Sequence, residues 1–113
     1  MKLGLLISGG LGLKILQNLS NVYEVSFILT DNVSSSIHEF AIKNEIPFFS
    51  GNPRNGKVSS FLRINICDVL ISVNYLFLID KEIINSPRIL AFNVHGSLLP
   101  KYRGRTPHVW AII

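Results

Sequence analysis

Short apolar runs alternate with amphipathic segments along most of the chain. Five runs rich in aliphatic and aromatic residues predict strands, at residues 3–8, 24–30, 46–49, 68–73 and 89–95. Between them, apolar residues recur near helical spacing and predict helices at residues 11–19, 34–45, 57–65 and, more briefly, 81–85. Strands that alternate with helices form right-handed crossovers. We therefore expect an α/β fold, with a mostly parallel sheet and helices on both faces.

Residues 106–113 predict the start of one more helix. Thr106 suits the cap position, and Pro107 suits the first helical position. The mostly apolar residues 108–113 end without a glycine, a basic last turn or a following strand. We therefore expect the chain to be the front part of a larger domain, truncated after the fifth strand and the start of the next helix.

Composition excludes several classes of protein. The 113 residues are 48% hydrophobic and 16% charged, which suits one domain and disfavours disorder and coiled coils. The longest nearly apolar run, residues 69–79, is too short to cross a bilayer, and no secretory signal is complete. The lone Cys67, expected to be a buried small hydrophobe, excludes a disulfide framework, and three scattered histidines give no metal-ligand spacing. These features predict a cytoplasmic protein with no metal and no membrane partner.

The net charge of +4 is confined to the last quarter of the sequence. Residues 1–82 are neutral, with seven basic and seven acidic residues. Residues 83–113 hold four basic residues and no acid, and three of the four lie within residues 101–105. A general nucleic-acid binder spreads its charge over a surface. This short basic loop instead fits a local phosphate or carboxylate, or a solvated loop without a partner.

Glycines cluster directly after the first predicted strand. Gly10 and Gly12 match the first two glycines of a dinucleotide-binding fingerprint. Asp31 follows about 20 residues later, where such proteins carry an acidic residue that binds the ribose of the nucleotide. The third position holds Ile15, where close helix packing calls for Gly or Ala. The cluster therefore favours a tight turn into a helix over a nucleotide site.

Asn93 and His95 form the sharpest candidate for chemistry. They lie two residues apart on the fifth predicted strand, so their side chains share a face near its carboxyl end. An amide donor can hold a developing oxyanion, and an imidazole can accept or relay a proton near neutral pH. The pair suits attack of an amine on a carbonyl. Taken alone, it fits a structural role as well.

The residues that follow extend this pair into a long motif. Residues 93–107 read Asn-Val-His-Gly-Ser-Leu-Leu-Pro-Lys-Tyr-Arg-Gly-Arg-Thr-Pro. The segment closely resembles the signature of the folate-dependent formyltransferases, with its Asn-x-His-x-Ser-Leu-Leu-Pro core. The Lys-Tyr-Arg-Gly-Arg form at 101–105 is most similar to the sugar-nucleotide N-formyltransferases. Extended weakly over residues 1–113, the resemblance implies the amino-terminal, Rossmann-like, folate-binding portion of the catalytic domain.

The resemblance implies roles for individual residues. Asn93 would polarise the formyl carbonyl of 10-formyltetrahydrofolate, and His95 would be the general base, or the charge partner, for the amine. Arg103 and Arg105 would meet anionic parts of the acceptor. Folate contacts are expected from Asn74, Tyr75, Leu76, Phe77, Leu78, Ile79, Ser97, Leu98, Leu99 and Pro100.

The resemblance leaves more than one function open. The first hypothesis is an enzyme that formylates the primary amine of a nucleotide-linked amino sugar, with a possible homodimer in the full-length protein. The alternatives are a methionyl-tRNA formyltransferase, whose partner is a nucleic acid, and a non-catalytic folate- or nucleotide-binding module. The family's third catalytic residue, an Asp beyond the motif, has no counterpart within residues 1–113. We therefore expect the isolated chain to transfer formyl groups inefficiently.

Overall fold

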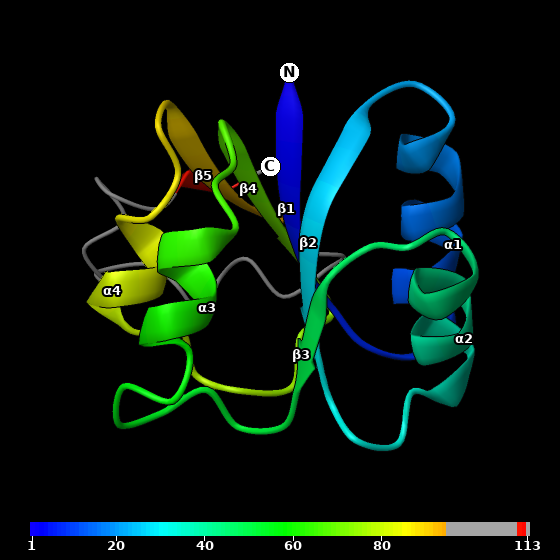
Figure 1. Cartoon of the computed structure of the whole chain (residues 1–113), viewed down its shortest axis with the longest axis horizontal. Helices are drawn as coiled ribbons and strands as arrows, with labels where there is room; N and C mark the ends of the chain where they lie inside the picture. Colours follow the sequence, from blue (N-terminus) through cyan, green and yellow to red (C-terminus); the bar gives the residue numbers. More distant parts are fainter. Residues whose placement is uncertain (95–110, 113) are drawn as a thin grey trace.

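The computed structural model describes residues 1–94 and 111–112 and shows one parallel sheet (Figure 1). Its six strands lie in the order β3-β2-β1-β4-β5-β6, and every pair of neighbours in it is parallel. The strands are β1 (Lys2–Ile7), β2 (Glu24–Thr30), β3 (Phe48–Ser50), β4 (Val69–Val73), β5 (Leu90–Val94) and β6 (Ala111–Ile112). The α/β, Rossmann-like parallel fold expected from the sequence is confirmed.

Helices cover both faces of this sheet. They are α1 (Gly9–Ser20), α2 (Ser35–Lys43), α3 (Ser59–Ile64) and α4 (Lys81–Ile84). Figure 1 shows α1 and α2 together on one side and α3 and α4 on the other. Each pair encloses a separate apolar core, with Leu16 and Ile37 on the first side and Leu62 and Ile83 on the second. No helix in the described part of the chain is long and apolar enough to span a membrane.

Gly4 in β1 makes room for the largest buried ring of the second core. A Cβ at Gly4 would lie 2.5 Å from Cζ of Phe27 and 3.0 Å from Sγ of Cys67. The Phe27 ring is fully buried and meets Phe61 of α3 edge-on, with ring centroids 5.7 Å apart. Cys67 is buried as expected, and burial raises the pKa of its thiol to about 11, so the thiol stays protonated at neutral pH.

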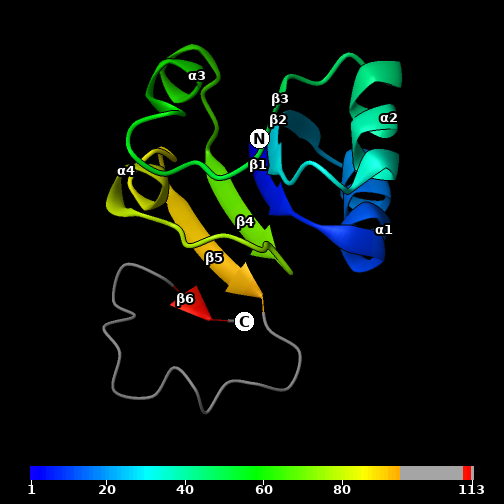
Figure 2. The same cartoon turned by 90° about the horizontal axis from the view of Figure 1, so that it is seen from below.

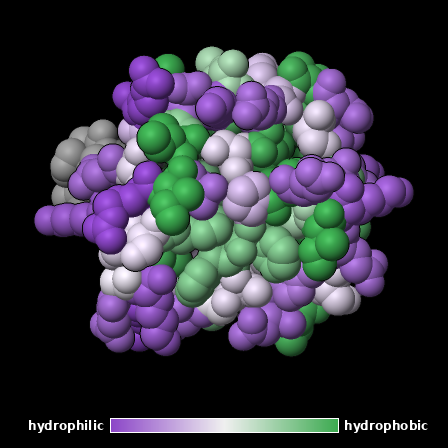
Figure 3. Space-filling model, viewed as in Figure 1, coloured by the Kyte–Doolittle hydropathy of each residue, from purple (hydrophilic) through white to green (hydrophobic). Residues whose placement is uncertain are grey.

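The edge strand β3 is only partly covered by the helices. Its three residues are all partly exposed. The space-filling view shows hydrophilic residues over most of the helices and apolar residues between the two helix layers, in the region of β3 (Figure 3). A three-residue strand is a short edge, which limits pairing with other chains.

The structure corrects the expected helix at residues 106–113. Ala111 and Ile112 form β6, which pairs with β5 through Phe92 and Asn93 (Figure 2). A short apolar run has no periodicity that separates helix from strand. Here the open edge of β5 offers backbone partners that a helix would leave unused. The sheet therefore continues past the fifth strand, while the expected cap at 106–107 lies outside the described residues.

Candidate functional site

The carboxyl ends of β1, β2 and β4 bring together one part of the candidate site. In the sheet order, β1 pairs with β2 on one side and with β4 on the other. The chain builds the sheet outward from β1 to β3 and then returns past β1 to β4, so the direction of the strand order reverses between β1 and β4. Open α/β sheets bind ligands at such a switch point. Ser8, Asp31 and Asn74 follow the three strands directly or within one residue.

Asp31 is the most heavily hydrogen-bonded side chain at this edge. Its buried carboxylate accepts hydrogen bonds from the amides of Val33 and Ser34 and from the Ser34 hydroxyl, each at 2.8 Å. Burial raises the pKa of Asp31, but the neighbouring donors of Ser8, Val33 and Ser34 outweigh it, so the pKa lies below its usual value. The carboxylate is therefore ionised at neutral pH and fixes the entry into α2. These bonds to the chain itself replace the ribose contact that a dinucleotide site would require.

A glycine turn beside Asp31 begins α1. Gly9 has a φ of +70°, which suits glycine, and its amide donates to the Ser34 hydroxyl at 3.0 Å. A Cβ at Gly12 would lie 3.0 Å from Cβ of Ile7, so Gly12 lets the helix approach β1 closely. Ile15 packs against the first core. The predicted tight turn into a helix is confirmed, and the helix comes closest to β1 at Gly12.

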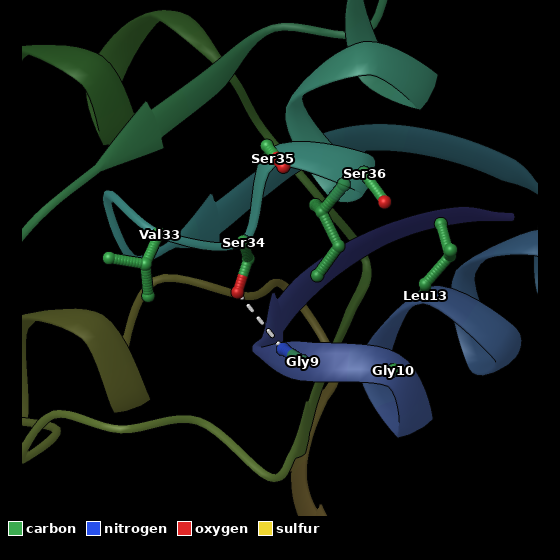
Figure 4. A pocket seen from close by; sticks show the side chains of 8 residues that line it. Gly9, Gly10, Leu13, Val33, Ser34, Ser35 and Ser36 are labelled. Carbon is green, nitrogen blue, oxygen red and sulfur yellow. Dashed lines mark hydrogen bonds between the residues drawn. The ribbon is translucent and has the colours of Figure 1, made fainter.

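A pocket of about 290 Å³ lies between the starts of α1 and α2 (Figure 4). Its lining combines two glycines, three serines and three apolar residues. They are Gly9, Gly10, Leu13, Val33, Ser34, Ser35, Ser36 and Ile37. Figure 4 shows the Ser34 hydroxyl pointing across the gap to the Gly9 amide, so this bond joins the two helix starts.

The carboxylate of Asp31 makes stability depend on pH. Because its pKa is lowered by folding, its contribution is fully present above the unfolded value of about 3.8 and is lost as pH falls through the folded pKa. Asp31→Asn is expected to lower the free energy of unfolding at pH 7 by about 1–3 kcal/mol. Urea unfolding at pH 7 and near pH 3 should show this deficit shrinking in acid. Glu39→Gln, at an exposed carboxylate of α2, is the control, and an equal deficit at both pH values would contradict the assignment.

The loop after β4 separates its side chains into two sets. Tyr75 and Ile79 pack against the second core, and the Tyr75 and Phe77 rings meet edge-on at 5.5 Å. Leu76 and Leu78 point outward, with exposed fractions of 63% and 75%. Of the six folate contacts expected at residues 74–79, the two leucines therefore offer the apolar surface that a ligand can cover.

Asn74 and Tyr75, the two polar residues of this loop, were also expected to contact folate, and the structure shows the surroundings of each. Asn74 has a φ of +58°, and its side-chain amide donates to the Ser8 carbonyl oxygen at 3.1 Å. The Tyr75 hydroxyl is buried without a hydrogen-bond partner among the described residues. Burial, together with the negative charge of Asp31, raises the pKa of Tyr75 well above its usual value.

Asn93 is the catalytic candidate that the structure describes. It lies one residue before the end of β5, partly buried, in register with Ser72 of β4. Ala91 and Leu70, also in register, belong to the second core, so Asn93 lies on the sheet face that α3 and α4 cover. The other expected site residues lie outside the described residues: His95, Ser97, Leu98, Leu99, Pro100, Arg103 and Arg105.

Sequence reasoning missed the two serines that join the loops of this edge. Ser8 supplies the carbonyl oxygen that Asn74 binds, and Ser34 bridges Asp31 and Gly9. The spacing from Asp31 to Ser34 is a local signal for such a turn, since an Asp side chain commonly accepts from amides two and three residues on. Nothing local marks Ser8, whose partner is 66 residues away. Within residues 1–94 and 111–112, no three His, Cys, Asp or Glu residues gather to hold a metal ion.

Comparison with known proteins finds one matching family model and several similar curated proteins. A family model described as Formyl transferase matches residues 27–113. A methionyl-tRNA formyltransferase from Microcystis aeruginosa is 37% identical over 82 residues, which cover 71% of this chain and 25% of that protein. The bifunctional polymyxin resistance protein ArnA from Wigglesworthia glossinidia brevipalpis is 38% identical over 80 residues, covering 70% of this chain and 12% of ArnA.

A longer match comes from a methionyl-tRNA formyltransferase of Clostridium acetobutylicum. It is 30% identical over 110 residues, which cover 87% of this chain and 36% of that protein. The chain thus spans between about an eighth and a third of the length of these curated relatives. The family model covers most of the chain, including β5 and the motif that begins at Asn93. The chain belongs to the formyl transferase family.

Proposed function

We propose that the protein transfers a formyl group from 10-formyltetrahydrofolate to a primary amine. The observation that carries the proposal is the position of Asn93, which opens the motif at the carboxyl end of β5 and lies inside the matched family segment. Val73 and Val94 are in register, so the loop that follows β4 starts at the same edge as the motif. A donor held by this loop would meet Asn93 at the edge where α/β sheets bind ligands.

The described residues fit a folate at the loop after β4. Folate is flat and aromatic at its pterin end, and such a group is bound by apolar side chains together with backbone polar groups. Leu76 and Leu78 present two exposed apolar side chains, while Tyr75 and Ile79 anchor the same loop in the core. An exposed leucine pair on an anchored loop is a surface that gains from being covered by a ligand.

Asn93 and His95 have complementary tasks in the proposed reaction. As the amine attacks, a carbon–nitrogen bond forms and negative charge develops on the formyl oxygen. The Asn93 amide donates a hydrogen bond to that oxygen. His95 accepts the proton that the amine loses, and a proton is returned to the folate nitrogen as its bond to the formyl carbon breaks. The folate supplies only the one-carbon unit.

Two acceptors remain candidates, each on its own observation. The comparisons favour methionyl-tRNA, which is named in most of the similar relatives. The Lys-Tyr-Arg-Gly-Arg sequence at residues 101–105 supports a nucleotide-linked amino sugar, because it resembles the sugar-nucleotide enzymes and holds three cations within five residues, a local charge that suits a phosphate group. The relatives therefore support methionyl-tRNA better, and the motif supports the amino sugar better.

Donor binding tests the first half of the proposal. Titration of the chain with 5-formyltetrahydrofolate, a stable analogue of the donor, should show saturable binding. Leu76→Ser combined with Leu78→Ser should weaken it at least about tenfold, since each covered leucine contributes about 1 kcal/mol or more. Ile42→Ser on α2 is the control, because Ile42 is 67% exposed and remote from the loop along the chain. Unchanged affinity in the double variant would exclude this loop as the donor site.

A transfer assay decides the acceptor. The full natural protein is supplied with 10-formyltetrahydrofolate carrying a labelled formyl group and is offered methionyl-tRNA or a nucleotide-linked amino sugar. Label on the tRNA identifies the first acceptor, and label on the sugar identifies the second. Donor binding without transfer to either would instead support the non-catalytic binding module.

A further inference from the structure

Asn74 holds an uncommon backbone conformation at the junction between β4 and the exposed leucines. Its φ of +58° lies in the left-handed region, which asparagine tolerates better than other residues with side chains. β4 ends at Val73, and Leu76 follows two positions after Asn74. The conformation of this one residue therefore sets the direction in which the loop leaves the sheet.

The side chain of Asn74 connects this junction to the start of α1. Its amide nitrogen donates to the carbonyl oxygen of Ser8 at 3.1 Å, and the same oxygen accepts from the Gly12 amide at 3.3 Å. That nitrogen would lie 3.4 Å from a Cβ placed on Gly9, so it rests against the glycine turn. Two segments separated by 66 residues are thereby fixed to each other.

The connection continues to the end of β2. The Gly9 amide donates to the Ser34 hydroxyl, which in turn donates to the ionised carboxylate of Asp31. The loop after β4 is thus joined through the turn before α1 to the entry of α2. Beyond this tether, no backbone–backbone hydrogen bond joins residues 75–79 to another described residue, and the loop is otherwise held by the partly buried side chains of Tyr75 and Ile79.

We propose that Asn74 is a positioning residue, whose bond to Ser8 orients the loop so that Leu76 and Leu78 face the formyl donor. The inference rests on the proposed function, because it assigns the donor to the two leucines. It gives Asn74 a task different from direct contact with folate. The engagement of its amide nitrogen with the Ser8 carbonyl oxygen supports this indirect role.

Two substitutions separate the conformation of Asn74 from its side-chain bond. Asn74→Gly keeps the left-handed backbone available and removes only the amide, whereas Asn74→Ala also makes that backbone unfavourable. Asn44→Ala is the matched control, since the Asn44 amide donates to the Phe40 carbonyl oxygen at 2.9 Å within one helix. The measurement is the dissociation constant of 5-formyltetrahydrofolate for the 113-residue chain, taken well below each variant's melting temperature.

Asn74→Gly is expected to weaken donor binding about fivefold, the size expected from losing one hydrogen bond, and Asn74→Ala to weaken it further. Asn44→Ala should leave the affinity unchanged. In a chain that already carries Leu76→Ser and Leu78→Ser, Asn74→Gly should have no further effect, because the side chains it orients are gone. A purely structural role would lower the melting temperature without this coupling.

The possible outcomes test the positioning role of Asn74 separately from the proposed donor site at Leu76 and Leu78. A wild-type chain that does not bind the folate overturns the donor-site proposal, and the role of Asn74 falls with it. Wild-type binding with equal affinity in Asn74→Gly overturns the positioning role alone. Equal losses from Asn74→Gly with and without the leucines would also overturn it, since the amide would then act independently of them.

Discussion

Replacing Asn93 with alanine is expected to slow formyl transfer by about 10²–10³-fold in the full natural protein. The proposed role of its amide is to donate a hydrogen bond to the formyl oxygen as charge develops there, so the loss falls mainly on kcat. Donor affinity should change by less than about threefold, since ground-state binding relies on other contacts. Single-turnover transfer of a labelled formyl group, with donor titration on the same variant, measures both quantities.

Two variants make the Asn93 result specific. Asn93→Asp keeps the size of the side chain but replaces the amide donor with a carboxylate, so it should be at least as slow as Asn93→Ala. Asn85→Ala, at the exposed end of α4, should transfer at the wild-type rate. Because Asn93 is partly buried in β5, circular dichroism must first show that each variant is folded. A folded Asn93→Ala protein that retains its rate would remove Asn93 from the mechanism.

Replacing Phe27 with alanine should produce the largest loss of stability. The ring is fully buried, lies against Gly4 and meets Phe61 edge-on, so its removal leaves a cavity between β2, β1 and α3. Such substitutions typically cost about 3–5 kcal/mol. That is a large share of the roughly 5–15 kcal/mol that stabilises a native domain. Urea unfolding should show a much lower midpoint for the 113-residue chain.

The control for Phe27 is another aromatic residue near β2. Tyr23 is 42% exposed at the entry to that strand, so Tyr23→Ala should cost about 1 kcal/mol or less. Phe27→Leu should fall between the two, because it retains part of the apolar volume. Similar midpoints for Phe27→Ala and Tyr23→Ala would show that the second core does not depend on this ring.

The order of strands and helices was predictable because it depends on local periodicity. Each apolar run is about as long as a buried strand, and the segments between them repeat apolar residues at helical spacing. The strand at Glu24–Thr30 has the same bounds in the prediction and in the structure. The bounds of the other four predicted strands differ from those in the structure by at most two residues at an end. Periodicity gave the wrong element at residues 111–112, because the five apolar residues at 109–113 were too few to show a period. The open edge of β5 decided the outcome there.

Candidate residues were predictable only where the chemistry is encoded in consecutive positions. The motif that begins at Asn93 indicates the family by its residue types, and the family match confirms that assignment. The sequence could not rank the residues of the loop at 74–79, because it predicted all six as folate contacts without distinguishing them. The fold separates them into partly buried anchors, two exposed leucines and one tethered asparagine.

The α/β parallel fold and the membership of the formyltransferases could both be inferred without coordinates, because both depend on short-range patterns of residue type and spacing. The hydrogen bonds from the amides of Val33 and Ser34 to Asp31, and the bond from Asn74 to the Ser8 carbonyl oxygen, became visible only in the folded chain. These bonds depend on which strand ends meet at the edge of the sheet. That meeting is set by the strand order β2-β1-β4, which brings together residues far apart in the chain.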